Sequence, residues 1–268
     1  MICSDYHIHS RFSEDCGTPL HSIVETAIQK GLERICITDH DDYGFEADEI
    51  GALKNPEEYV AAIQRLREEY EDRIEILLGV EMGMQPIQDV EAHFSKLTEE
   101  YPFDFVINSM HIVDGRDPYF GELFDEMSDE DAYRFTFQHM QECIRKIPDF
   151  DVLGHIDYIV RYGTQKAEHY SCLRLSEELD ALLQTVIDMG KGIEINTSGL
   201  RYLGFCHPHM DILQRYRELG GEIITFGSDA HRPEDIAYGF HLAEELLRSI
   251  GYKYYTCFRK REAFFMKI

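Results

Sequence analysis

Histidines and carboxylates recur along this chain where apolar, β-branched segments end. Six of its thirteen histidines occupy such places, and two acidic residues do the same. The eight residues are His7, His9, His40, His111, His155, His231, Glu81 and Asp229. Imidazole and carboxylate together suit divalent ions such as zinc, manganese and iron, and such ions lower the pKa of a bound water. If the fold brings these side chains together, they form a metal centre that can activate water for hydrolysis.

The first pair, His7 and His9, has the spacing needed to bind one ion. Side chains two residues apart on a strand project to the same side of it. The same spacing recurs at His207 and His209, around Pro208, where a helix is expected to start and capping or surface roles are the better interpretation. The pair alone is therefore weak evidence for a metal site.

Each later motif adds one or two residues to the set. A single histidine of this kind is more often a hydrogen-bonded core residue, but recurrence at successive strand ends favours a shared site. A carboxylate can bridge two ions, whereas a neutral imidazole generally binds one, so Glu81 is the natural shared ligand. The motifs are ITDH (37–40), GVEMG (79–83), SMH (109–111), GHID (154–157) and GSDAH (227–231).

Other hydrolytic and phosphate-binding chemistries lack sequence support. The chain contains neither a GxxxxGK phosphate loop nor a GxSxG nucleophile elbow. With 26 basic and 51 acidic residues, its formal charge of -25 would repel a nucleic-acid backbone, and no basic patch interrupts this pattern. These features favour metal-activated water acting on a small substrate.

The order of the expected elements predicts how the motifs meet. Short apolar runs alternate with longer amphipathic stretches, which is typical of a parallel sheet with crossover helices. The 268 residues suit one α/β barrel, so we expect a single domain over 1–268, with the carboxyl ends of all strands on one face. The expected strands are Ile2–His7, Arg34–Thr38, Ile74–Gly79, Phe103–Asn108, Asp151–Gly154, Gly192–Asn196 and Glu222–Gly227.

Capping residues mark several expected helix starts. The signals are Thr18 before Pro19, Asn55 before Pro56, and Ser128 with Asp131 ahead of a helix running toward Ile147. Gly31 is placed to end the first helix, since glycine tolerates the left-handed conformation found there. The tail from Tyr252 to Ile268 predicts two short strands around a charged turn, which could close one end of the barrel.

The composition also bears on location. No apolar stretch approaches the ~20 residues that a membrane span needs, and the first residues do not resemble an export signal. Seven scattered cysteines form no CxxC pair, so we expect reduced thiols, a cytoplasmic protein and no membrane association. Whether the protein is a monomer or a homodimer stays open.

The ordered motifs HIHS, ITDH, GVE, SMH, GHID and SDAH resemble those of the polymerase and histidinol phosphatase (PHP) superfamily. The resemblance covers residues 1 to about 240 and is greatest to the histidinol-phosphatase branch. It implies a distorted TIM-like barrel of seven strand-helix units, the PHP fold, and a centre of three divalent metal ions, whether zinc, manganese or iron.

The resemblance also implies a role for each motif residue. In relatives, histidine often stands where this chain has Asp15, and Glu14 beside it is the fallback ligand. The first ion would take His7, His9, Glu81 and Asp229, the second Glu81, His111 and His155, and the third Asp15, His40 and His231.

Two arginines on loops of the active face are expected to bind the substrate phosphate. They are Arg161 in HIDYIVRYG and Arg201 in NTSGLRYLG, and a planar guanidinium can bind two phosphate oxygens at once. The second loop also offers Asn196 and Ser198 as hydrogen-bonding groups.

The hypothesis that follows is a phosphomonoesterase in which a metal-bridging hydroxide attacks phosphorus. Asp229, His231, Glu81 and Arg161 are expected to take part in catalysis. The resemblance implies L-histidinol phosphate as the substrate, which would place the reaction in histidine biosynthesis. Two alternatives stay open: a PHP phosphoesterase acting on another small ester, such as a nucleotide or sugar phosphate, and a metal-binding regulatory module without activity.

Overall fold

The chain folds as a nearly closed barrel of parallel strands. A computed structural model describes residues 2–45, 51–165 and 170–268. Seven strands pair in chain order, and the two-residue strand β3 (His40–Asp41) pairs with β4 beside them. The seven strands are β1 (Ser4–Ile8), β2 (Arg34–Ile37), β4 (Glu75–Gly83), β5 (Phe105–Ser109), β6 (Val152–Leu153), β7 (Gly192–Asn196) and β8 (Ile224–Gly227).

The first and last barrel strands approach each other. A parallel bridge joins Ile8 to Ala230 just beyond β8. The amide of His9 donates to the carbonyl of Ala230 at 3.0 Å, and the amide of Asp229 donates to the carbonyl of His7 at 2.9 Å. This contact places the HIHS and GSDAH motifs side by side, although more than two hundred residues separate them.

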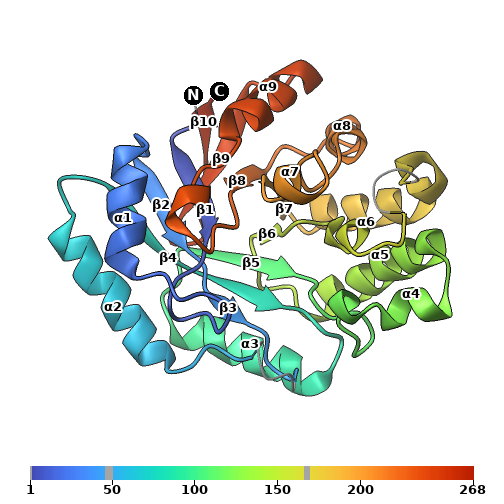
Figure 1. The fold of residues 1–268 in the computed structure, drawn as a ribbon, viewed down its shortest axis with the longest axis horizontal. Coiled ribbons are helices and arrows are strands. Elements are labelled where there is room, and N and C mark those ends of the chain that lie inside the picture. Colours follow the sequence, from blue (N-terminus) through green and yellow to red (C-terminus); the bar gives the residue numbers. More distant parts are fainter. Residues whose placement is uncertain (1, 46–50, 166–169) are drawn as a thin grey trace.

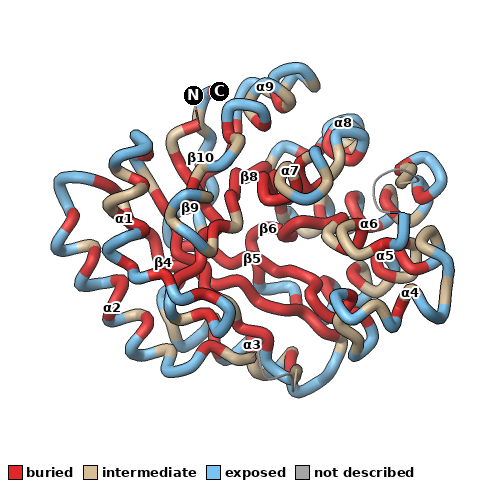
Figure 2. The backbone as a smooth tube through the Cα atoms, in the orientation of Figure 1, coloured by how far each residue is buried: buried red, intermediate tan, exposed pale blue. Residues whose placement is uncertain are grey.

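Helices cover the outside of the strands (Figure 1). Their apolar residues join one continuous core, and in Figure 2 the strands are buried while the outer faces of the helices are exposed. The helices are α1 (Leu20–Gln29), α2 (Pro56–Glu69), α3 (Gln88–Glu100), α4 (Glu122–Glu126), α5 (Asp129–Lys146), α6 (Ser176–Asp188), α7 (Gly199–Tyr202), α8 (Met210–Glu218) and α9 (Phe240–Ile250). None of them combines the length and the apolar composition of a bilayer-crossing helix.

The predicted barrel and its seven strands are confirmed, with shifts at their ends. The largest shift is in β4, which continues to Gly83 instead of ending at Gly79. Glu81 therefore lies inside a strand and not after one. Strand β3 was not predicted, because two polar residues carry no apolar pattern. It pairs His40 directly with Glu81 and so fixes the positions of these two residues relative to each other.

Two of the three expected helix caps are confirmed. The side chain of Asn55 accepts the amide of Glu58, and that of Ser128 accepts the amide of Asp131. The predicted cap at Thr18 is wrong. Its hydroxyl donates instead to the carbonyl of His231 at 2.8 Å, because the loop after β1 turns back toward the loop after β8. Gly31 follows α1 with φ +78, as predicted.

The tail forms the expected hairpin of β9 (Tyr254–Arg259) and β10 (Glu262–Lys267). It packs against the barrel end away from the carboxyl ends of the strands. There the hydroxyl of Tyr6 donates to the carbonyl of Phe258 at 2.7 Å, and the amide of Ile224 donates to the hydroxyl of Thr256 at 3.1 Å. Both contacts are buried, so the hairpin closes this end of the core.

Candidate metal centre

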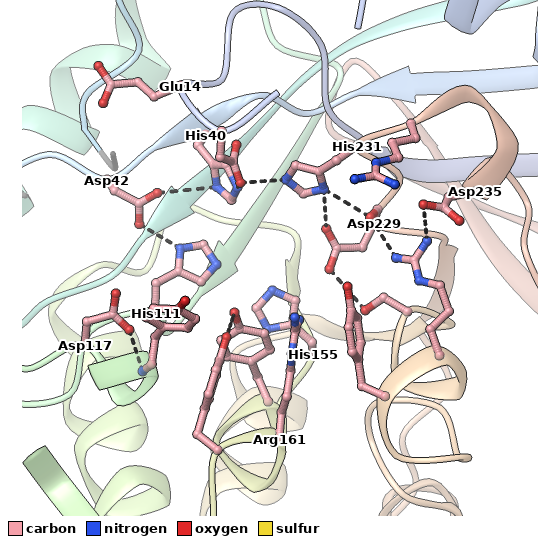
Figure 3. Close-up of a pocket in the computed structure, with 18 of the residues that line it drawn as sticks. Glu14, His40, Asp42, His111, Asp117, His155, Arg161, Asp229, His231 and Asp235 are labelled. Carbon is pink, nitrogen blue, oxygen red and sulfur yellow. Dashed lines mark hydrogen bonds and ion pairs between the residues drawn. The ribbon is translucent and has the colours of Figure 1, made fainter. Parts of the chain in front are cut away.

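A pocket opens on the barrel face where the carboxyl ends of the strands gather (Figure 3). Loops after β1, β5, β6 and β8 contribute Asp15, His111, His155 and Asp229 to its lining, and β3 contributes His40. Because every strand runs in the same direction, motifs remote in the sequence meet here. All nine residues proposed as ligands from the sequence lie in this pocket or directly beneath it.

Beneath the pocket, the pair from β1 meets two carboxylates. Nε2 of His7 lies 3.0 Å from Oε2 of Glu81 and 3.8 Å from Oδ1 of Asp229. Nε2 of His9 lies 3.4 Å and 3.3 Å from the same two oxygens. Both histidines and Glu81 are fully buried. Four donor atoms thus converge on one small volume, as a cation site requires.

The other oxygen of Glu81 faces a second pair of histidines. Its Oε1 lies 2.9 Å from Nε2 of His155 and 3.3 Å from Nε2 of His111. The carboxylate therefore divides its two oxygens between two groups of imidazoles. This is the geometry expected of a carboxylate shared between neighbouring ions.

A third group lies nearer the mouth of the pocket. Nε2 of His231 is 2.9 Å from Oδ2 of Asp15, and Nε2 of His40 is 3.8 Å from the same oxygen. The ring of His9 stacks between these two imidazoles, with centroid distances of 4.2 Å to His40 and 4.1 Å to His231. Glu14, the fallback ligand, instead forms an ion pair with Lys54.

The pKa values of the clustered histidines and carboxylates are shifted because these groups lie so close to one another. Burial lowers the pKa of His7, but the carboxylates of Glu194 and Glu81 outweigh it and raise that pKa well above 6.5. The pKa of Glu81 in turn lies well below its usual value, because the surrounding imidazoles outweigh the effect of burial. Burial and the neighbouring imidazoles lower the pKa of His9 to about 3.

Several buried nitrogen and oxygen atoms of the cluster lie close to one another but lack the alignment of a hydrogen bond among the described residues. Unpaired buried polar atoms are costly, and in native proteins they point to an unseen partner. In this cluster they face the same interior space, which fits divalent cations bound by imidazole and carboxylate. The atoms are Nε2 of His7, His9 and His231, Nδ1 of His40 and Oε2 of Glu81.

Two buried acids that the sequence analysis did not single out orient the histidines. Oε1 of Glu194, in β7, lies 2.6 Å from Nδ1 of His7, and Oδ1 of Asp42 lies 2.7 Å from Nδ1 of His111. Each contact fixes the proton on Nδ1 and leaves Nε2 free for a cation. The only sequence signal was the position of the two acids, within GIEIN and directly after TDHD.

Asp39 holds the loop that follows β1. It accepts hydrogen bonds from the amide and hydroxyl of Ser10 and of Ser13, at 2.6 to 3.0 Å. The hydroxyl of Ser13 also accepts the amide of His40 at 3.0 Å and lies 3.2 Å from Nδ1 of His9. This buried carboxylate therefore supports two histidines without contacting the cation space itself.

Asp5 supports the loop after β8 in the same way. Its carboxylate accepts the amide and hydroxyl of Ser228 and the amide of Ala237, at 2.5 to 3.0 Å. The next residue, Asp229, adopts φ +53, a left-handed conformation that is uncommon outside glycine. The hydrogen bonds to Asp5 stabilise the turn that aims Asp229 into the pocket.

The two predicted phosphate-binding arginines both line the pocket. The guanidinium carbon of Arg161 lies 3.5 Å from the ring centroid of Tyr202, and Arg161 has no acidic partner among the described residues. Arg201 is already engaged, because its Nη1 lies 2.7 Å from Oδ2 of Asp235. Arg161 is therefore the more available of the two for an anion.

The comparisons with known proteins agree with this geometry. The model of the PHP domain family matches residues 5–198, which include most of the clustered motifs. This chain belongs to the PHP family. The predicted family membership is thereby confirmed, and the Asp229 and His231 motif lies beyond the matched range.

Curated PHP relatives include histidinol-phosphatase from Lactococcus lactis subsp. lactis, which is 31% identical and covers 92% of this chain and 91% of its own. A probable histidinol-phosphatase from Clostridium acetobutylicum is 30% identical, and the match covers 93% of this chain and 94% of the relative. A crystal structure of histidinol phosphate phosphatase from Lactococcus lactis contains zinc, L-histidinol and phosphate. It superposes with a TM-score of 0.88 at 29% identity, over 97% of this chain and 98% of that one.

One histidine in this PHP chain differs from its sequence interpretation. His207 is fully buried and not a surface group, because its Nδ1 lies 2.6 Å from the buried Asp157. His209 does cap α8, with its ring accepting the amide of Asp211. Both stay outside the metal cluster. Asn196 and Ser198, which the sequence analysis named as hydrogen-bonding groups, lie beside Asp229, at 3.4 and 3.2 Å from its Oδ2.

Proposed function

We propose that this chain is a metal-dependent phosphomonoesterase that hydrolyses L-histidinol phosphate to L-histidinol and inorganic phosphate, a step of histidine biosynthesis. The observation that carries the proposal is the shared position of Glu81, whose two oxygens face two groups of histidines in a pocket that also contains Arg161. The similar Lactococcus enzyme, with zinc, L-histidinol and phosphate bound, supports the choice of substrate.

The proposed ligands follow the three groups in the pocket. We assign His7, His9, Glu81 and Asp229 to one ion, Glu81, His111 and His155 to a second, and Asp15, His40 and His231 to a third. Three ions, as zinc, manganese or iron, are part of the proposal. When bound, such ions lower the pKa of water to supply a nucleophile and neutralise phosphate oxygens.

The chain's own groups would position the ester. The guanidinium of Arg161, which has no acidic partner among the described residues, would bind the phosphate. Arg201 would add a donor from the neighbouring loop while Asp235 holds it in place. Ser198 lies 3.2 Å from Asp229 and can donate to the carboxylate or to a phosphate oxygen. Buried Glu81 and partly buried Asp229 would keep their ligand oxygens fixed, so little reorganisation is needed when the ester binds.

The proposed setting is the cytoplasm, as a monomer or homodimer acting on a small molecule. All seven cysteines are free thiols, which suits a reducing compartment. The net charge of -25 opposes binding to nucleic acid.

The direct test measures phosphate release by the purified, metal-loaded protein from L-histidinol phosphate and from a panel of nucleotide and sugar phosphates. We expect kcat/KM for L-histidinol phosphate to exceed that of every other ester at least roughly tenfold, a difference of about 1.4 kcal/mol. Asp229→Asn should abolish turnover of all of them. Equal rates across the panel would contradict the substrate, and full metal content without turnover of any ester would favour the regulatory module.

A further inference from the structure

One wall of the pocket carries an acid and two aromatic rings that the metal centre does not use. Asp117 begins the short helical turn Pro118–Phe120, and Asp117, Tyr119 and Phe120 all line the pocket. Tyr119 and Phe120 are 69% and 66% exposed, the highest values among the aromatic residues of the described chain, and together they form an exposed apolar patch. In Figure 3, Asp117 lies with Glu14 and Asp42 along one side of the pocket, across from Asp229 and Asp235.

Asp117 differs from the other pocket acids outside the proposed ligand set. Its Oδ1 accepts the amide of Tyr119 at 2.8 Å, and within the described residues neither of its oxygens has a basic side chain as a partner. Burial raises its pKa, so an unpaired charge there is costly. The other acids have basic partners: Lys54 for Glu14, His111 for Asp42 and Arg201 for Asp235.

Within the described part of the chain, the same pocket therefore holds a carboxylate without a basic partner, Asp117, and a guanidinium without an acidic partner, Arg161. A ligand that carries a phosphate and a cationic group close together would pair with both. L-Histidinol phosphate has this chemistry, because its ammonium group lies on the carbon next to the one that bears the phosphate ester. Its flat imidazole would extend beyond the ammonium, toward the mouth of the pocket.

We propose that Asp117 binds the ammonium group of the substrate's alcohol, and that the exposed rings of Tyr119 and Phe120 cover its heterocycle. This inference rests on the proposed function and names the residues that select the leaving group. A charge-assisted hydrogen bond from the ammonium would satisfy Asp117, and the rings would lose exposed area on binding. Asp117 would act on specificity, since it would bind the ammonium group and not the reacting phosphate.

The test compares kcat/KM for L-histidinol phosphate with that for 4-nitrophenyl phosphate, whose alcohol is flat and aromatic but carries no cation. The ratio of the two should fall roughly 10- to 100-fold in Asp117→Asn. Asp117→Glu, which keeps the negative charge, should restore part of the lost ratio. Asp114→Asn is the matched control, because Asp114 lies on the same loop, is exposed and does not line the pocket, so its ratio should stay that of the wild type. An unchanged ratio in Asp117→Asn would overturn the proposal.

A second pair of substrates separates this inference from the proposed function. 2-Aminoethyl phosphate has the ammonium without the ring, and ethyl phosphate has neither. If the wild type does not prefer L-histidinol phosphate over the nucleotide and sugar phosphates, the proposed function fails, but the inference is still decided. A preference for 2-aminoethyl over ethyl phosphate that disappears in Asp117→Asn supports the ammonium site. No preference, or one that survives the substitution, rejects it.

A separate measurement tests whether the rings of Tyr119 and Phe120 bind the heterocycle of the substrate. Tyr119→Ala and Phe120→Ala should each lower the ratio of kcat/KM for L-histidinol phosphate to that for 2-aminoethyl phosphate by roughly 3- to 10-fold, because only the first ester has a ring to cover. If both variants leave this ratio unchanged, the rings do not bind the heterocycle. Metal content and circular dichroism of every variant establish that it is folded and loaded.

Discussion

Oε1 of Glu194 lies 2.6 Å from Nδ1 of His7, and this contact turns Nε2 of His7 toward Glu81. The other oxygen of Glu194 accepts the amide of His155 and the side-chain amide of Asn196, each at 3.1 Å. One buried carboxylate thus receives three donors and ties β7 to two of the proposed ligand histidines. Its contact with His7 depends on the near closure of the barrel, because β7 lies next to β8 and the end of β8 meets β1.

Replacing Glu194 by glutamine should weaken metal binding. Glutamine keeps the shape but offers a single acceptor oxygen to the three donors, so the ring of His7 loses its fixed orientation. We expect a roughly 10- to 100-fold loss of metal affinity, measured as the metal retained against graded concentrations of a chelator.

Asp157→Asn is the matched control for that variant. Asp157 forms an equally short buried contact, 2.6 Å, with Nδ1 of His207, and also accepts the amide of His209. This substitution should lower the melting temperature and leave metal affinity unchanged. If both variants lost metal to the same extent, the effect of Glu194→Gln would be one of general stability.

The third proposed ion can be tested through Asp15 and its neighbour Glu14. Asp15 contacts His231 at 2.9 Å, whereas Glu14 pairs with Lys54. Asp15→Asn should therefore reduce the metal bound per chain by one ion, measured by elemental analysis after dialysis, and Glu14→Gln should leave the count unchanged. Loss of an ion in Glu14→Gln alone would reverse the assignment.

The sequence was sufficient for the barrel and for most of the proposed ligands because both follow from short-range patterns. Apolar runs identify strands, and a parallel barrel brings their carboxyl ends to one face, so His111 and His155 could be placed together without any contact information. The same reasoning placed Arg161 and Arg201 at the pocket.

The supporting acids could not be predicted in this way. Glu194 and Asp42 resemble ordinary polar residues in or after a strand, and their roles depend on pairing across the barrel. The error at Thr18 has the same origin, because its partner, the carbonyl of His231, is over two hundred residues away. Long-range hydrogen bonds leave no local pattern in the sequence.

Arg161 should control phosphate binding. Arg161→Met removes the charge and keeps an apolar side chain against the ring of Tyr202. We expect kcat/KM to fall roughly 100-fold and inorganic phosphate to inhibit more weakly, with metal content unchanged. Arg174→Met, on an exposed site outside the pocket, is the control and should have wild-type kinetics. Unaltered phosphate inhibition in Arg161→Met would exclude this role.

The stability of protein stripped of metal should depend on pH through His40. Burial alone would lower the pKa of His40, but the carboxylates of Glu81, Asp42 and Asp15 raise it from 6.5 to about 9. Because the folded state holds this proton more tightly than the unfolded chain, the stabilisation is fully present below pH 6.5 and is lost as the pH rises through about 9.

The His40 proton should therefore contribute a fall on the order of 2 kcal/mol to the free energy of unfolding of the stripped protein, measured in urea, between those two pH values. His40→Gln should make the decrease smaller without abolishing it, because the pKa of His7 is also raised above 6.5. His21→Gln, at an exposed histidine paired with Glu69, should preserve the full decrease. In the metal-loaded protein a bound cation would replace the proton near the same carboxylates, so the decrease of stability with pH should be smaller. A stability that rose over this range in stripped protein would contradict the proton's role in holding the carboxylates together.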